Sequence, residues 1–120
     1  RDSSVTGVQT CALPIFIGRN IQMIGGRRGL AALPGSFVHI GDSTIVGVAN
    51  SIGIRAHEAQ VYYQGAKLSQ LYCGLECVGG AVIWGTPAEW NEVQTDYSLA
   101  QCGVACGLFG GSWQCVRGNG

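Results

Sequence analysis

The sequence predicts an α/β domain built around a small parallel sheet. Short apolar segments that are typical of strands alternate with longer segments that are typical of helices, as in βαβ units. Glycine, at 20 of 120 residues, separates many of these segments. The expected strands cover residues 36–40, 59–63, 80–84 and 112–116, and the expected helices cover residues 44–54, 68–77 and 88–105.

Each expected strand is a short apolar run that stops at turn-forming residues. Residues 36–40 lie between Pro34-Gly35 and Gly41-Asp42, and residues 59–63 stop at Gly65. The third run is apolar throughout and stops at Gly85, whereas the fourth has the weakest pattern. Among the helical segments, residues 88–105 begin directly after a proline, with acidic side chains near the positive end of the helix dipole.

A six-residue periodicity supports a different, all-β fold. A small residue recurs every sixth position, and three of these residues follow an aliphatic one. This pattern resembles the hexapeptide repeat of left-handed parallel β-helices, in which each hexad forms one side of a triangular coil. The positions are Gly29, Gly35, Gly41, Gly47, Gly53, Ala59 and Gly65. The alternative prediction is therefore a fragment of a left-handed parallel β-helix.

The charge balance argues against several classes of partner. The formal net charge is zero, charged residues make up 12% of the chain, and Lys67 is the only lysine. Since there is no basic stripe to follow a phosphate backbone, we expect no nucleic-acid partner. No apolar run approaches the roughly 18–20 residues that cross a bilayer, so we expect no membrane span.

The segment FVHIGDSTIVG, residues 37–47, contains the sharpest local motif. It resembles the first conserved block of the SGNH (GDSL-type) hydrolases, in which an apolar strand leads into Gly-Asp-Ser. The resemblance implies a three-layer α/β fold, acyl-ester hydrolysis and Ser43 as the nucleophile. Residues 61–69 resemble the second block, which implies that the backbone N–H of Gly65 is an oxyanion donor. The implied substrate is a small ester or acylated molecule, with no cofactor and no metal.

Later blocks of that family are incomplete or absent. Gly85 fits the third block, but Asn91 lies too far along the chain and no Asp follows it. The final Asp-x-x-His block is missing, and we expect His39 in a strand and His57 in a loop. Without a histidine base, a serine hydroxyl is a weak nucleophile at neutral pH. The resemblance therefore covers the first half of such an enzyme, and we expect this chain to be inactive as it stands.

Two Cys-Gly-x-x-Cys segments, at residues 73–77 and 102–106, leave further alternatives open. The second resembles the nucleophile region of C39-type cysteine peptidases, which implies Cys102 as nucleophile and Gln94 as its oxyanion partner. Disulfides or buried thiols are the plainer interpretation. Structural zinc sites favour shorter Cys-x-x-Cys spacings, so we expect no metal.

The eleven residues 5–15, VTGVQTCALPI, resemble the translation of a short-read sequencing-library adapter. The resemblance implies that residues 1–15 belong to no domain, form no part of a core and carry no function. It also implies that the natural protein is longer, and that any signal peptide has been lost. Excluding Cys11 leaves five cysteines, and this odd number argues against a closed disulfide framework. The cysteine content weakly favours a secreted or periplasmic location.

The expected organisation is one small domain over residues 16–120. Three hypotheses for its function remain open. The first is a fragment of an SGNH-like serine hydrolase with Ser43 and Gly65 in its site. The second is a non-enzymatic, Gly/Cys-rich structural or binding protein, either a β-helix or a disulfide domain. The third is a fragment of a C39-like cysteine peptidase.

Overall fold

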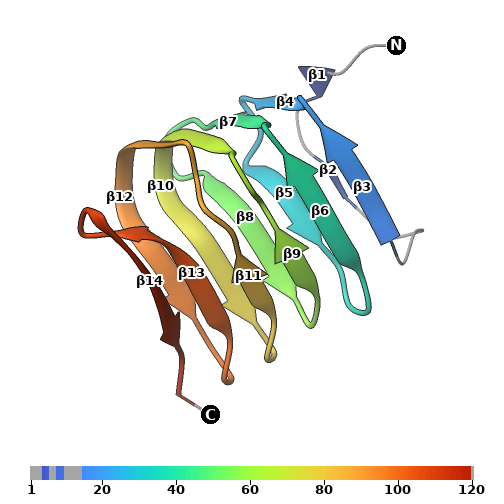
Figure 1. Ribbon diagram of the computed structural model, residues 1–120, viewed down its shortest axis with the longest axis vertical. Helices are drawn as coiled ribbons and strands as arrows, with labels where there is room; N and C mark the ends of the chain where they lie inside the picture. The colour runs from blue at the N-terminus through green and yellow to red at the C-terminus, as the bar shows by residue number, and fades with distance from the viewer. Residues whose placement is uncertain (1–3, 6–7, 10–14, 120) are drawn as a thin grey trace.

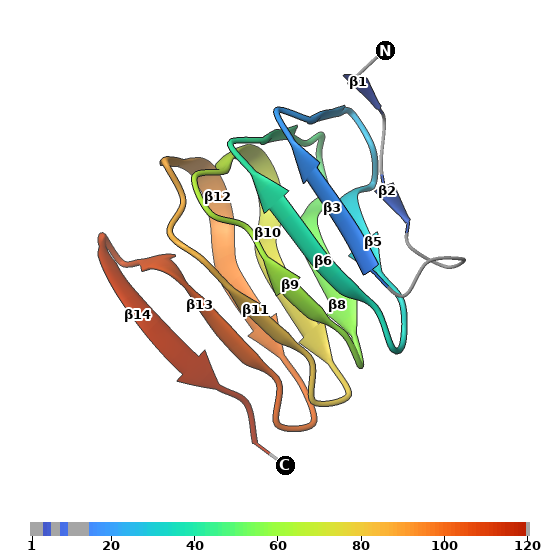
Figure 2. The same cartoon turned by 45° about the vertical axis from the view of Figure 1, so that its right-hand side comes forward.

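The computed structural model describes residues 4–5, 8–9 and 15–119, and these residues form a parallel β-solenoid (Figure 1). No helix occurs in the described residues, so they contain no helix that could span a membrane. The predicted three-layer α/β fold is wrong. The all-β alternative agrees with the structure in its architecture, since successive strands stack in parallel along the length of the molecule (Figure 2).

The strands form two sheets, and the larger sheet bends to make two sides of the coil. The six-stranded sheet contains β3 (Ile15–Arg19), β6 (Phe37–Gly41), β9 (Gln60–Tyr62), β11 (Val82–Trp84), β13 (Val104–Phe109) and β14 (Ser112–Arg117). The eight-stranded sheet contains β1 (Ser4–Val5), β2 (Val8–Gln9), β4 (Gln22–Ile24), β5 (Arg28–Ala32), β7 (Thr44–Val46), β8 (Ile52–His57), β10 (Lys67–Val78) and β12 (Glu89–Leu99). β10 pairs with β7 through its first residues and with β8 through its last.

The register fixes the length of one coil. In the six-stranded sheet Phe37 lies opposite Gln60, and Gln60 lies opposite Val82, so a coil takes 22 or 23 residues. Three six-residue sides would make a shorter coil. The every-sixth glycines consequently fall at different places: Gly41 ends β6, Gly47 follows β7, and Gly53 lies within β8.

The segments predicted to be helical form strands and the turns between them, and in residues 68–77 the apolar spacing fits a helix and a bent strand equally well. Leu68, Leu71 and Leu75 have the i, i+3, i+7 spacing of a helix. In the structure Gln70 turns a corner with φ = 58°, so Leu68 belongs to one side of the coil. After the corner, every second side chain from Leu71 to Cys77 is buried, as expected of a strand.

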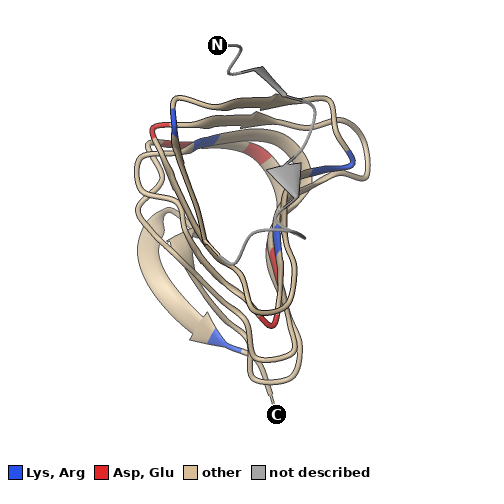
Figure 3. Cartoon of the chain, turned by 90° about the vertical axis from the view of Figure 1, so that its right-hand side faces the viewer, with Lys and Arg blue, Asp and Glu red and all other residues tan. Residues whose placement is uncertain are grey.

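Files of aliphatic side chains fill the interior, one from each side of the coil. Leu30, Ile54 and Leu75 occupy equivalent positions on β5, β8 and β10, and all are fully buried. Similar files run through Met23, Ile45 and Leu68, and through Val38, Val61, Ile83 and Ala105. No charged side chain of the described residues is buried, and the positions of the charged residues are marked along the coil outline in the end-on view (Figure 3). Stacked burial of this kind is the main stabilising term of a solenoid.

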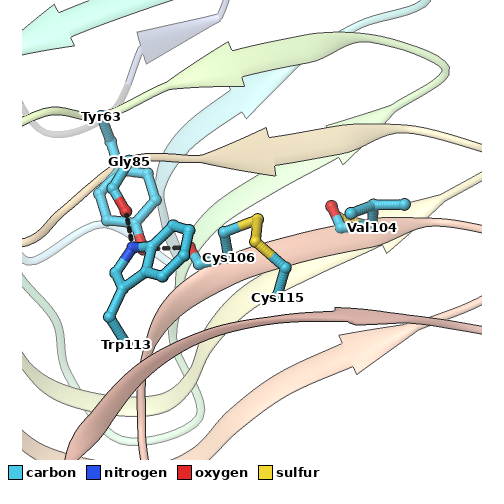
Figure 4. Close-up of a disulfide and its surroundings, with 7 residues drawn as sticks. Tyr63, Gly85, Val104, Cys106, Trp113 and Cys115 are labelled. Carbon is cyan, nitrogen blue, oxygen red and sulfur yellow. Dashed lines mark hydrogen bonds between the residues drawn. A yellow bond between two sulfur atoms is a disulfide. The ribbon is translucent and has the colours of Figure 1, made fainter.

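The four strands predicted from the sequence all occur, although their bounds differ by up to two residues. β6, β9, β11 and β14 correspond to the expected segments 36–40, 59–63, 80–84 and 112–116. β14 differs from the rest because it pairs antiparallel to β13. A disulfide between Cys106 and Cys115 joins these two strands (Figure 4).

The segment that resembles an adapter translation is described only in part. The backbones of β1 and β2 pair with β4 and β5, and Ile15 begins β3 with its side chain exposed. Residues 1–3, 6–7 and 10–14, including Cys11, lie outside the described residues. That this segment forms no part of a core therefore stays a prediction.

Candidate binding groove

Ser43, the expected nucleophile, is fully buried at a corner between β6 and β7. Its hydroxyl donates to the carbonyl of Gly41 at 3.1 Å and accepts from the backbone N–H of Ile21 at 3.2 Å. Both hydrogen-bonding directions of the hydroxyl are thus satisfied by backbone groups. The side chain links two neighbouring coils.

Gly65, the expected oxyanion donor, lies at the same corner one coil further on. Its backbone N–H donates to the carbonyl of Thr86 at 2.8 Å, which is part of the ladder between coils. Its φ of 74° and the Asp42 carboxylate, 2.5 Å from where a Cβ would lie, explain the glycine. The structure brings Ser43 and Gly65 to one corner, but the Ser43 hydroxyl and the Gly65 N–H both hydrogen-bond to backbone groups. Their catalytic roles therefore stay predictions.

The two histidines lie apart from that corner. His39 is on the outer face of β6, where its ring packs 4.8 Å from that of Tyr62. The Tyr62 ring in turn lies 5.2 Å from that of Trp84 on the next coil. Because each ring packs against its neighbours, we interpret this file as stabilising cross-strand contacts. His57 ends β8 beside the third corner, where the chain returns to the six-stranded sheet.

The five cysteines of residues 16–120 divide into three environments. Cys106 is disulfide-bonded, and Cys102 is exposed in the turn between β12 and β13. Burial raises the pKa of the Cys73 thiol to about 11 and that of Cys77 to about 12. Both thiols therefore stay protonated at neutral pH, which makes them poor nucleophiles and poor metal ligands. No cluster of three metal-ligating side chains occurs among the described residues.

A groove of about 410 Å³ lies at the second corner, where the β7 side of the coil turns into the β8 side. The Tyr72 groove, as we call it, is lined by three neighbouring coils. Its lining includes Val48 and Asn50 from the β7–β8 connection, Gln70 and Tyr72 from β10, and Glu92 and Gln94 from β12.

A longer corner on one coil shapes this groove. Five residues separate Val46 from Ile52 in the sequence. Only three separate the equivalent residues of β10, Ser69 and Cys73. The buried Ser51 hydroxyl fixes the longer turn by bonding to both the N–H and the carbonyl of Val48. Val48 lies in this longer turn and is 49% exposed.

Three groove residues have a backbone conformation that L-residues rarely adopt. The φ values are 66° at Asn50, 58° at Gln70 and 54° at Glu92. Asn tolerates this left-handed region, but Gln and Glu have no such preference. The conformation directs two long polar side chains outward on consecutive coils.

The polar side chains of the groove have no partner within the described part of the chain. Asn50, Gln70, Glu92 and Gln94 are exposed and make no side-chain hydrogen bond or ion pair there. Tyr72 is 50% exposed, and its ring packs against no other aromatic ring of the described residues. These groups are therefore available to a ligand.

A second groove, of about 390 Å³, lies at the third corner. Its lining is largely small residues, among them Gly35, Gly79 and Gly80, with Glu58 and Gln60 as its long polar side chains. It carries fewer hydrogen-bonding side chains than the Tyr72 groove.

Comparison with protein-family models, with curated proteins and with solved structures gave no match to this chain. Sequence reasoning also did not identify the Tyr72 groove. Its residues come from three coils, and only Gln94 belongs to a motif, the segment that resembles C39-type peptidases. Aligning the chain at a period of 22 would have revealed the longer β7–β8 corner, but six-residue spacing concealed that period.

Proposed function

We propose that this chain is a non-enzymatic binding module, in which a rigid β-solenoid presents a ligand-binding groove at its second corner. The observation that carries the proposal is the Tyr72 groove itself. It combines a half-exposed aromatic ring with four polar side chains that lack partners in the described structure. Concave surfaces of this size with a few convergent polar groups are the usual form of ligand sites.

The chemistry of the groove favours binding over bond breaking. Glu92 is its single carboxylate, and no serine or cysteine of the described residues lines it. Acid–base catalysis generally requires a second group placed to give or take a proton. The Cys106–Cys115 disulfide supports an oxidising compartment for this protein.

The proposal is tested by nuclear magnetic resonance with a panel of three probes. These are cellohexaose, an oligogalacturonate and tri-lysine, which are neutral, anionic and cationic respectively. We expect at least one probe to shift the backbone amides of residues 48–50, 70–72 and 92–94 in a saturable manner. Amides of the third-corner groove, residues 58–60 and 79–80, serve as the internal control.

Two outcomes contradict the proposal. One is that none of the three probes shifts the amides of the Tyr72 groove. The other is hydrolysis of p-nitrophenyl acetate by the chain but not by its Ser43→Ala variant, which would restore the esterase hypothesis.

A further inference from the structure

We propose that the Tyr72 groove binds a neutral saccharide chain that lies along the solenoid axis, with one sugar ring against Tyr72. This inference rests on the proposed binding function and specifies the class of ligand. Four properties of the groove support it: its charge, the type of its polar groups, its exposed apolar surface and its direction.

The charge of the groove disfavours an ionic ligand. Among the described residues that line it, Glu92 is the only one with a charged side chain. An anionic ligand would meet no cation there and would be repelled by Glu92. A cationic ligand would find one exposed carboxylate, which contributes little in water.

The polar groups match hydroxyls. The side-chain amides of Asn50, Gln70 and Gln94 each offer both donors and acceptors, and the Glu92 carboxylate offers acceptors. A sugar hydroxyl is likewise both a donor and an acceptor, so neighbouring hydroxyls can both donate to and accept from an amide, and can donate to the carboxylate. Exposed amides also lose less solvation than charged groups when a ligand covers them.

The apolar surface matches the C–H face of a sugar ring. Tyr72 is 50% exposed and Val48 is 49% exposed, and both line the same groove. A tyrosine provides a large, stiff contact surface at low cost in conformational entropy. In contrast to Tyr62, whose ring lies near those of His39 and Trp84, Tyr72 has no ring partner in the described structure.

The direction of the groove follows from the register. Ser69 lies opposite Asn91, so the next residues, Gln70 and Glu92, occupy equivalent positions on consecutive coils. Neighbouring parallel strands are about 4.8 Å apart. Gln70 and Glu92 thus form a polar file parallel to the axis, which an extended chain of sugar units can follow.

The left-handed conformation of Gln70 and Glu92 provides a test that separates binding from stability. Glycine adopts positive φ without strain, so Gln70→Gly and Glu92→Gly remove a ligand contact but should not lower the unfolding midpoint. A purely structural role for these side chains predicts the opposite pairing, with lower stability and unchanged binding.

The experiment is calorimetric titration of the full chain with cellohexaose, xylohexaose and mannohexaose, with an oligogalacturonate and tri-lysine as charged comparisons. We expect at least one neutral hexasaccharide to bind, with an affinity that does not change between low and high salt. Tyr72→Ala should weaken this binding about tenfold or more, and Gln70→Gly and Glu92→Gly each about fivefold. Gln60→Ala, in the third-corner groove, should leave it unchanged.

The outcomes separate the two proposals. If the groove binds only oligogalacturonate or tri-lysine, the saccharide inference is wrong and the binding function stands. If neutral sugars bind but Tyr72→Ala and Glu92→Gly have no effect, the site lies elsewhere and the inference is also wrong. If no probe binds at the groove, both proposals fail.

Discussion

Tyr63 is the largest fully buried side chain of the described residues, and two later glycines make room for it. A Cβ on Gly85 would lie 3.0 Å from the Tyr63 backbone, and one on Gly107 would lie 2.6 Å from the Tyr63 hydroxyl. That hydroxyl donates to the carbonyl of Cys106 at 2.6 Å (Figure 4). One aromatic residue thereby ties three successive coils together.

Replacing this tyrosine tests the value of the buried hydrogen bond. We expect Tyr63→Phe to lower the free energy of unfolding by about 1–2 kcal/mol, because a buried donor is lost and the ring remains. Tyr62→Phe is the matched control, since its hydroxyl bonds to Gln64 at the surface and should contribute less than about 0.5 kcal/mol. Urea unfolding measures both variants, and equal losses would contradict the assignment.

The buried thiols make stability depend on alkaline pH. The folded-state pKa values of Cys73 and Cys77, about 11 and about 12, are raised mainly by burial. The stabilisation from keeping them protonated is complete below the unfolded thiol pKa of about 8.5 and is lost as the pH rises towards the folded values. We therefore expect the free energy of unfolding to fall between pH 9 and pH 11.

The control for this pH dependence is the double variant Cys73→Ala/Cys77→Ala. Its free energy of unfolding should fall less steeply over the same range. Some slope should remain, because burial also raises the pKa of Tyr63. Identical slopes for the two proteins would show that the thiols do not titrate differently in the folded state.

At the level of elements, close contact between coils restricts the side chains of three strands. Gly29, Gly53 and Gly74 lie on β5, β8 and β10, and a Cβ on any of them would meet a backbone carbonyl of the next coil within 3 Å. The backbone ladders between neighbouring strands hold those carbonyls in place. These glycines therefore allow the coils to stack.

A pair of glycine variants separates this contact from backbone strain. Gly53→Ala places a Cβ 2.6 Å from the Gly74 carbonyl, and we expect a loss of about 2–3 kcal/mol. Gly35→Ala meets nothing within 4 Å but has φ = 84°, so its loss should be about 1 kcal/mol. Urea unfolding measures the free energy of unfolding of both variants. A larger loss for Gly35→Ala than for Gly53→Ala would contradict the argument.

Four of the strands could be predicted from the sequence, whereas the main prediction for the fold was wrong and only its all-β alternative agrees with the structure. Runs such as residues 80–84 are apolar, short and bounded by glycine, and these local signals suffice for a strand. The corners could not be predicted, because Gln70 and Glu92 adopt positive φ without the Gly or Asn that marks such a turn. Without those corners, Leu68 to Cys77 fits a helix equally well.

The candidate site could not be predicted from the sequence for a related reason. Gly-Asp-Ser is both a motif of catalytic serines and an ordinary turn, and here Ser43 bonds backbone across a corner. The Tyr72 groove depends on which residues stack on consecutive coils. That information requires the period of 22 or 23 residues, which no short motif contains.

For the molecule as a whole, stacked strands leave exposed edges. The edges of β12, in the eight-stranded sheet, and of β13, in the six-stranded sheet, are protected in different ways. In the described residues β12 pairs only with β10, and Glu89, Glu92 and Asp96 lie along it. Charged side chains on an edge strand oppose pairing with another molecule. β13 has no such charges, and β14 covers its edge instead.

The disulfide holds that cover in place, which leads to a prediction about association. Cys115→Ser removes a cross-link across 9 residues and should destabilise β14 by about 2–3 kcal/mol. We expect faster hydrogen exchange of the β14 amides, and association of the variant in light scattering, because the β13 edge becomes accessible. Cys102→Ser is the matched control, since Cys102 is exposed and unpaired, and it should change neither measurement. If β14 exchanges at the same rate in both variants, its own hydrogen bonds and the contact of Val116 with the core are sufficient to cap the sheet.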